Sequence, residues 1–436
     1  MGAESTGYHR AGPRFARSVR MFHNHPTRNM RVAVVGCSHG HLDQIYQSIH
    51  RINKEAKRAG EKPVELLLCC GDFQANRCNA DLCTMKAPPK FRLMNDFHNY
   101  YAGRKRAPVL TIVIGGNHEA MGHMWECYHG AWLAPRIYYL GAAGCVLVDG
   151  WLRVAGASGI WHASDWKKGH FERIPYIPST LASAYHVRQY DITRLMNLRG
   201  PSVDIFMSHD WPNGIEKHGD TQTLLRDNPR FKTSVMSNTL GSPPLETLLK
   251  KLRPRRWVSG HMHIRFTASV PHGKQPEANE YTHFLALDKP GEGRPFIEVI
   301  DVPTPETHAN SGSEGPQLFF DPHWLAVVRA FASYLPLQEQ ATQLPSPTLV
   351  PQLLEDALQW VRANVGEDGV KIVDDVQVFQ HTAPPTRSAN ANEITNERPR
   401  AYSNPQTQAF CDMLGITNVI GEETNSVLDR PKEQSG

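Results

Sequence analysis

Five short polar motifs in this chain carry side chains that could bind metal ions, and each motif follows an apolar stretch. In chain order the motifs are Gly36-Cys37-Ser38-His39-Gly40, Gly71-Asp72-Phe73, Gly116-Asn117-His118-Glu119, Ser208-His209-Asp210 and Gly260-His261-Met262-His263. Together they offer a thiolate, a carboxylate, an amide oxygen and several imidazoles, a mixture that suits first-row divalent metals such as Mn, Fe or Zn. The sequence therefore predicts a site for a pair of divalent cations.

The apolar stretches before these motifs are typical of buried strands that alternate with helices. We expect strands at 30–35, 64–70, 108–114, 203–207 and 256–258, and helices at 42–57, 91–101, 179–198 and 244–252. Short β-prone runs separated by glycine at 137–157 indicate antiparallel strands and the start of a second sheet. The alternation predicts an α/β layered fold. Because loops beyond the carboxyl ends of parallel strands share one edge of a sheet, the five motifs can converge there.

A single motif of this kind carries little information, since the chain has 22 histidines. A lone histidine is more often a core or surface residue than a metal ligand. The combination is more specific, because GD, GNHE, SHD and GHMH occur in this order and each follows a predicted strand. A zinc ribbon is excluded, because the chain lacks paired CxxC spacings.

The set resembles the metallophosphoesterase (calcineurin-like) superfamily, whose pattern is D-x-H, GD, GNHE, a later H and GHxH. The chain departs from this pattern at its first position, where Cys37 replaces the usual Asp. A cysteine there is similar to the RNA lariat debranching enzymes, and the segments GCSHGHLDQIY, LLLCCGDFQ, APPKFR, IGGNHEA, KKGHFE, IFMSHDWP and NTLGSP also resemble that family. The resemblance covers about residues 30–290 and continues in FDPHWLAVVRAF at 320–331.

The resemblance implies a β-sandwich flanked by helices, with the ligands divided between two metal pockets. One pocket would be formed by Cys37, His39, Asp72 and His263. The other would be formed by Asp72, Asn117, His209 and His261, so that Asp72 bridges the two ions. His118 would bind no metal and would act as the general acid, with Glu119 supporting it or a ligand.

The reaction implied by the resemblance is hydrolysis of the 2′,5′-phosphodiester bond at the branch point of an excised intron lariat. Two nearby metals can acidify a water, orient the phosphate and offset charge during an in-line attack. An imidazole that titrates near neutral pH suits protonation of the leaving ribose oxygen. The cofactors would be two divalent ions, Fe²⁺, Zn²⁺ or Mn²⁺, and the thiolate of Cys37 would favour Zn or Fe over Mg in the first pocket.

Segment 158–188 corresponds to the lariat recognition loop of the family. It mixes cationic and aromatic side chains, which could hold phosphates and stack unpaired bases of a branched RNA. The candidate contacts are Trp161, Lys167, Lys168, His170, Phe171 and Tyr176. The alternative for each is a local core or solvated surface role. Lys86, Lys90, Arg92 and the basic run 104–106 are further candidates for phosphate contacts, for which we favour a role on the solvated surface.

Length and composition bound the organisation of the chain. A chain of 436 residues exceeds one hydrophobic core, and no apolar run approaches the roughly 20 residues of a membrane span. We expect a basic extension at 1–29, a catalytic domain at 30–302, a linker at 303–316, a small helical region at 317–366 and a largely disordered tail at 367–436. We expect the extension to be disordered or an artefact of a start codon upstream of Met30, in preference to a targeting segment.

The charge and cysteine content bear on partners and compartment. The net charge of +4 permits a polyanionic partner without requiring one, and eight cysteines without a preceding secretory segment favour a reducing compartment. With the resemblance, this predicts a nuclear protein, with the cytoplasm as an alternative, that acts in mRNA splicing with splicing-associated proteins. The competing hypotheses are a phosphoesterase with another substrate, such as a phosphoprotein, and a non-catalytic RNA-binding relative.

Overall fold

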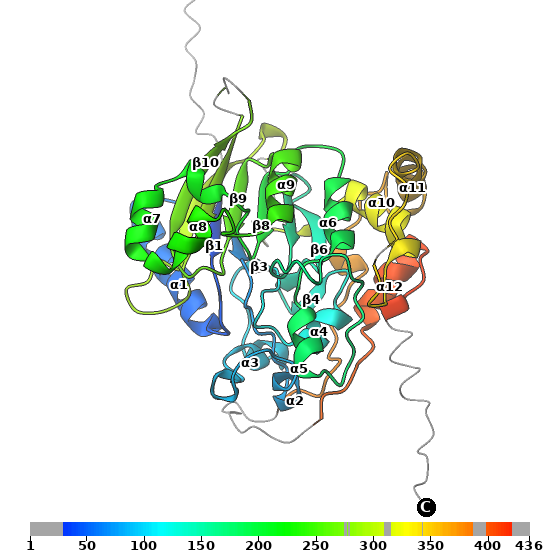
Figure 1. Ribbon diagram of the computed structural model, residues 1–436, viewed down its shortest axis with the longest axis horizontal. Coiled ribbons are helices and arrows are strands. Elements are labelled where there is room, and N and C mark those ends of the chain that lie inside the picture. The colour runs from blue at the N-terminus through cyan, green and yellow to red at the C-terminus, as the bar shows by residue number, and fades with distance from the viewer. Residues whose placement is uncertain are drawn as a thin grey trace, which may run out of the picture.

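Two packed sheets form the centre of the computed structural model, with helices on their outer faces (Figure 1). The structure describes residues 29–273, 277, 280–308, 315–341, 343–386 and 398–420. The predicted extension at 1–29 therefore lies outside the described residues except for its last residue, and so does the middle of the predicted linker. Among the described residues no helix has the length and apolar character needed to cross a bilayer.

The first sheet has the strand order β12-β1-β2-β3-β5-β4. Its strands are β1 (Asn29–Val35), β2 (Leu66–Cys69), β3 (Leu110–Val113), β4 (Ala131–Ala134), β5 (Ile137–Tyr139) and β12 (Ile297–Pro303). β1, β2, β3 and β5 are parallel, and the two edge strands are antiparallel. Their near-continuous apolar sequences suit strands that are covered on both faces.

The second sheet has the order β10-β11-β9-β8-β7-β6-β13. Its strands are β6 (Ala143–Val148), β7 (Leu152–Ala157), β8 (Ile205–Ser208), β9 (Arg256–Ser259), β10 (Phe266–Pro271), β11 (Tyr281–Ala286) and β13 (Leu318–Phe320). Its centre is again parallel, from β7 through β8 and β9 to β11. The sequence predicts that the second sheet starts within 137–157. It starts there at β6, whereas β5, which also lies in this range, belongs to the first sheet.

Alternation along the strands divides the core into two clusters. In β1, Val32 and Val34 pack in the large cluster that also contains Phe206 and Trp257 of the second sheet. Ala33 and Val35 face the other way, into a cluster with residues of α1. Successive side chains of a strand point to opposite faces, so one strand contributes to both layers.

Helices and short turns cover the sheets and connect the strands. They are α1 (Leu42–Ala59), α2 (Asn79–Leu82), η1 (Pro89–Phe91), α3 (Phe97–Tyr101), α4 (Met121–Glu126), α5 (Pro178–Ser183), α6 (Gln189–Met196), η2 (Ile215–His218), α7 (Thr221–Asp227), η3 (Pro229–Phe231), α8 (Lys232–Met236) and α9 (Pro243–Leu252). The helix expected at 179–198 is two helices, because the N–H of Val187 donates to the Ile160 carbonyl between them. That bond joins the two ends of segment 158–188 to each other.

The C-terminal region is integrated into the fold. It contains η4 (Glu306–His308), α10 (Pro322–Phe331), η5 (Ala332–Tyr334), α11 (Val350–Asn364), η6 (Val373–Asp375) and α12 (Pro405–Leu414). The structure confirms the predicted helices and differs from the tail predicted to begin at residue 367, because residues 367–386 and 398–420 are folded. The Gln406 amide accepts from the Trp132 N–H and donates to the Trp132 carbonyl, so α12 satisfies the outer edge of the first sheet.

A buried ion cluster joins the C-terminal region to the catalytic domain. The guanidinium of Arg77 donates to Asp81 at 2.9 Å, to Glu126 at 2.7 Å and to the Thr382 hydroxyl at 2.5 Å. Burial raises the pKa of Glu126 to about 7, against the opposing effect of Arg77. Without the guanidinium, two buried carboxylates would face each other.

We therefore expect Arg77→Met to lower the free energy of unfolding by about 3–5 kcal/mol, the range for a buried ion pair that loses one partner. Chemical denaturation of the purified protein measures this change. Arg226→Met is the matched control, because Arg226 pairs with Asp227 in solvent, where an ion pair contributes at most about 1 kcal/mol. Equal stability of the two variants would contradict the account of this cluster.

Candidate metal centre

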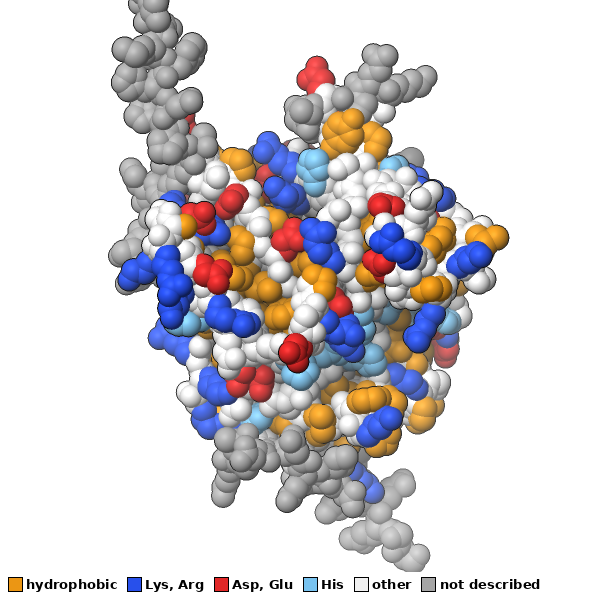
Figure 2. Space-filling model, turned by 90° about the vertical axis from the view of Figure 1, so that its left-hand side faces the viewer, with side chains coloured by type: hydrophobic (Ala, Val, Ile, Leu, Met, Phe, Trp, Pro, Cys, Tyr) orange, Lys and Arg blue, Asp and Glu red, His pale blue; other side chains and the backbone are white. Residues whose placement is uncertain are grey.

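The loops that follow five parallel strands meet at one place on the molecule. Cys37 and His39 follow β1, Asp72 follows β2, Asn117 and His118 follow β3, His209 follows β8, and His261 and His263 follow β9. Histidine side chains gather on one face of the molecule, with cationic and hydrophobic side chains around them (Figure 2). The two sheets thus bring together residues that are far apart in the sequence.

Four predicted ligands form a compact first group. One ligand atom from each of Cys37, His39, Asp72 and His263 lies within 4.8 Å of the others. Nε2 of His39 is 2.9 Å from Nε2 of His263 and 3.5 Å from Oδ2 of Asp72. Thiolate, imidazole and carboxylate at these separations fit one transition-metal ion with tetrahedral-type ligands.

The other predicted ligands lie on the opposite side of the same carboxylate. Oδ1 of Asp72 is 3.4 Å from Nε2 of His209, which is 3.2 Å from Oδ1 of Asn117. The rings of His209 and His261 have centroids 5.0 Å apart. Because the two oxygens of Asp72 face different groups of ligands, this one side chain can serve both.

Hydrogen bonds fix the orientation of the buried ligands. Nδ1 of His209 donates to the Cys70 carbonyl at 2.7 Å, which leaves the Nε2 lone pair of the neutral ring facing Asn117 and Asp72. The thiol sulfur of Cys37 is buried and accepts the N–H of His261 at 3.0 Å. Both groups are therefore oriented before any ion binds.

Four of the candidate ligands adopt left-handed backbone conformations that side chains rarely take. The φ angles are 45° at His39, 48° at Asp72, 64° at His261 and 51° at His263. Such residues cost of order 1–3 kcal/mol each and persist where the surrounding structure imposes them, often at functional sites. The strained turns aim side chains inward immediately after each strand ends.

Burial and neighbouring side chains keep three of the histidines and Asp72 in the protonation states that bind metal ions. Burial lowers the pKa of His39 to about 3 and the pKa values of His209 and His263 to about 4, so the three rings are neutral. Burial alone would raise the pKa of Asp72, but the imidazoles of His209, His39 and His118 hold it well below its usual range. An anionic carboxylate among neutral imidazoles is a suitable cage for divalent cations.

The thiol of Cys37 behaves differently without a cation. Burial and the charge of Asp72 raise its pKa well above the ordinary value, whereas the Lys289 ammonium opposes the shift. Lys289 also contributes to the lowered pKa values of His39 and His263. The sequence analysis did not single out Lys289, because no motif marks it. Its loop reaches the site because the Leu287 and Asp288 carbonyls lie against Gly36.

His118 lies beside the predicted ligands without joining them. Its backbone N–H donates to Oδ1 of Asp72 at 2.9 Å, and its ring centroid is 5.7 Å from that of His39. Nδ1 of His118 lies 3.1 Å from the Lys86 carbonyl, to which it can donate only if it carries the proton. The other ring nitrogen, Nε2, then remains for proton exchange.

Glu119 supports the loops rather than the ring of His118. Its buried carboxylate accepts backbone N–H groups of Phe73 at 2.7 Å, Gln74 at 2.7 Å and Gly116 at 2.8 Å. These three bonds join the loop after β2 to the loop after β3. Glu119 therefore holds Asp72 and Asn117 in a fixed relation.

Segment 158–188 places the candidate RNA contacts in different environments. Lys167 is exposed, Trp161 packs edge-on against Trp166 with centroids 5.4 Å apart, and Tyr176 is half-buried. The ammonium of Lys168 pairs with Asp165 at 3.1 Å and Glu339 at 2.8 Å, and lies 5.5 Å from the Phe171 ring centroid. Lys168 would have to leave these partners to hold a phosphate.

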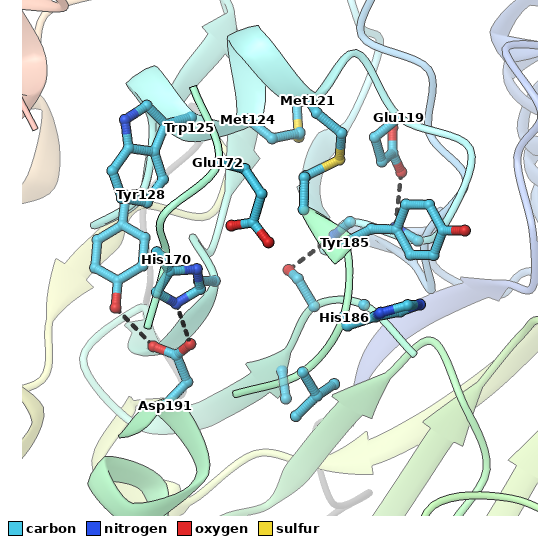
Figure 3. A pocket seen from close by; sticks show the side chains of 18 of the residues that line it. Glu119, Met121, Met124, Trp125, Tyr128, His170, Glu172, Tyr185, His186 and Asp191 are labelled. Atoms are coloured by element: carbon cyan, nitrogen blue, oxygen red, sulfur yellow. Dashed lines mark hydrogen bonds and ion pairs between the residues drawn. The ribbon is translucent and has the colours of Figure 1, made fainter. Parts of the chain in front are cut away.

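His170 lies in the wall of a cavity beneath this segment (Figure 3), which Tyr176 also lines. Its Nε2 is 2.7 Å from Asp191, whose other oxygen accepts from the Tyr128 hydroxyl at 2.6 Å. The cavity extends to Gly116 and Glu119, behind the metal centre. The structure thus places His170 in an internal hydrogen-bond chain and not on the surface with Lys167.

The close approach at Gly116 yields a direct test of the centre. A Cβ at this position would contact Oδ1 of Asp72 and lie 2.7 Å from Cε1 of His209. We expect Gly116→Ala to displace both ligands and reduce bound metal, measured by elemental analysis of the purified protein. Gly115→Ala is the control, because its Cβ would meet nothing closer than 3.5 Å and should leave metal content unchanged.

The thiolate of Cys37 provides a second test. We expect Cys37→Ser to lose about half of the bound Zn²⁺ or Fe²⁺, because an alcohol is a much poorer anionic ligand than a thiolate. Titration with a chromogenic chelator measures the loss. Retention of the full metal content would mean that Cys37 only packs at this position.

Two known protein families match parts of this chain. Residues 30–265 match the calcineurin-like phosphoesterase family, which binds divalent metals, and residues 279–419 match the C-terminal domain of the lariat debranching enzyme. The lariat debranching enzyme of Arabidopsis thaliana is 39% identical and covers 91% of this chain and 90% of its own length. Those of Danio rerio and Homo sapiens are 41% and 39% identical, covering 89% and 93% of this chain and 66% and 72% of their own lengths. The chain therefore belongs to the lariat debranching enzyme family, within the calcineurin-like phosphoesterases.

Proposed function

We propose that this protein hydrolyses the 2′,5′-phosphodiester bond at the branch point of excised intron lariats, with two divalent metal ions and His118 as general acid. The observation that carries the proposal is the position of Asp72, whose two oxygens face two groups of ligands. The names of the relatives support the choice of a branched RNA over a phosphoprotein as substrate. The complete set of predicted ligands argues against a non-catalytic RNA-binding relative.

The residues of the two groups have distinct tasks. Cys37, His39 and His263 would hold one ion, and Asn117, His209 and His261 the other, with Asp72 shared. Fe²⁺, Zn²⁺ and Mn²⁺ all suit these donors. Bound divalent cations supply Lewis acidity at the phosphate and lower the pKa of the attacking water.

His118 is placed to assist departure of the ribose 2′ oxygen. Attack of water on phosphorus breaks the bond to O2′, and that oxygen needs a proton to leave as a hydroxyl. Nδ1 of His118 lies against the Lys86 carbonyl, so the transferred proton would come from Nε2. The hydrogen bond between its backbone and Asp72 keeps the residue beside the candidate ligands, which supports this role.

We further propose that the protein acts in the nucleus, where excised introns arise. The eight cysteines are all free thiols, and most are buried, which suits a reducing compartment. Splicing-associated proteins would be its partners there. Imaging of a fluorescently tagged chain tests the placement, and exclusion from the nucleus would contradict it.

The substrate is tested by incubating the metal-loaded protein with a synthetic 2′,5′-branched RNA beside its linear 3′,5′ counterpart. We expect only the branch to be hydrolysed, giving a linear RNA and a free 2′ hydroxyl. A monoester phosphatase assay runs in parallel. Hydrolysis of the monoester without loss of the branch would favour a phosphoesterase with another substrate.

The acid is tested by His118→Ala. We expect the rate on branched RNA to fall by about 10²–10⁴-fold, the usual contribution of general acid catalysis. Metal content should stay at the wild-type level, because His118 binds no ion. A variant that loses metal together with activity would show that His118 is a ligand.

A further inference from the structure

The segment Thr84–Leu93 borders the metal centre, yet the proposed reaction uses none of its side chains. One end is attached to the general acid, because the Lys86 carbonyl contacts Nδ1 of His118 at 3.1 Å. Beyond the other end, the Asn95 amide donates to the His39 carbonyl at 3.3 Å. The segment is thus fixed relative to two residues of the site.

This segment presents an aromatic ring to solvent. Phe91, in η1, is 57% exposed and is the only aromatic among the large apolar side chains that are exposed in the described part of the chain. Leu93 beside it is 39% exposed. Adjacent exposed apolar side chains form a patch, and apolar patches on a surface mark interaction sites more often than isolated apolar side chains do.

The charge around the ring has one sign. Thr84–Leu93 contains three cations, Lys86, Lys90 and Arg92, and no acidic residue. The Lys90 ammonium lies 4.9 Å from the Phe91 ring centroid, and Nε of Arg92 donates to the Ala87 carbonyl. None of the three cations forms an ion pair with a carboxylate of the described residues. Their charge is therefore available to an anionic ligand.

The same segment touches the predicted recognition loop. The Lys86 ammonium donates to the Pro178 carbonyl at 3.2 Å, and the adjacent Ile177 is 58% exposed. The cationic segment and the loop thus form one continuous border next to His118.

We propose that Phe91, together with Lys90 and Arg92, binds an unpaired nucleotide of the RNA that flanks the branch. The base would stack on the ring of Phe91, and the two cations would contact its phosphates. An exposed aromatic among cations is the usual platform for single-stranded nucleic acid, and it tolerates any base because each base has a π face. The inference rests on the proposed function and adds a substrate contact outside segment 158–188.

The test is the dissociation constant for a fluorescent branched RNA with a single-stranded arm and a non-hydrolysable triazole at the branch, measured by anisotropy with the metal-loaded protein. We expect Phe91→Ala to raise the dissociation constant about ten-fold, the size of one base–aromatic stack. Phe91→Trp should restore binding to within about two-fold, and Phe91→Leu should not. Equal binding by the wild type and Phe91→Ala would overturn the proposal and favour a protein partner for the ring.

Salt dependence separates the ring from the cations. Affinity for RNA falls as salt rises. Lys90→Gln should make the slope of log affinity against log salt less steep by about 0.7, the value for one phosphate contact on a single strand. Phe91→Ala should weaken binding without changing this slope. A Phe91→Leu variant that binds like the wild type would show that only apolar contact matters and would also overturn the stack.

Leu349→Ala is the matched control for loss of an exposed apolar side chain. Leu349 is 44% exposed and precedes α11, which lies on the opposite side of the molecule from α3 (Figure 1). Cleavage of the natural branched RNA is measured in parallel. If the wild type cleaves the branched RNA and Phe91→Ala binds it as tightly as the wild type, only the proposed stacking contact is wrong. If the wild type does not cleave the RNA and Phe91→Ala binds it more weakly, only the proposed reaction is wrong.

Discussion

The metal centre depends on one buried carboxylate, that of Asp72. Burial disfavours the charge of a carboxylate, and here imidazoles on both sides and the His118 N–H stabilise it instead. Each oxygen faces a different group of ligands, so the distance between the two groups is set by the width of one side chain. The proposed chemistry needs two cations a few ångströms apart, and Asp72 fixes that spacing.

Much of the surrounding architecture serves to hold this carboxylate. Asp72 adopts a left-handed backbone conformation. The Glu119 carboxylate accepts hydrogen bonds from the two residues after Asp72 and from Gly116, and so links the two loops. The absence of a side chain at Gly116 leaves room for Asp72 and His209. The two sheets supply the frame, since their parallel central strands direct five loops to the same place.

The clustering of the candidate ligands could be predicted from the sequence because they follow strands in short motifs. Cys37, His39, Asp72 and His263 are brought together as expected, and the comparisons confirm the family that the motifs resemble. Lys289 could not be predicted in the same way, because a loop after β11 carries it to the site without a recognisable pattern. The role of Glu119 as a link between loops also required the three-dimensional structure.

The C-terminal region shows where local sequence signals fail. Residues 398–404 are mostly polar, with two arginines and one proline, which is typical of disorder, yet α12 follows them directly and packs on β4. The reason is a long-range pairing, because Gln406 bonds to Trp132 and Gln377 bonds to Tyr138 and Gly130. Composition within a short window contains no information on partners more than 200 residues away.

The central claim is that Asp72 is shared by two cations. The most direct measurement is the anomalous scattering of crystals of the full chain soaked with Mn²⁺. The account predicts two peaks on either side of Asp72, one beside Cys37, His39 and His263 and the other beside Asn117, His209 and His261. A single peak, or two peaks of which one lies away from Asp72, would contradict it.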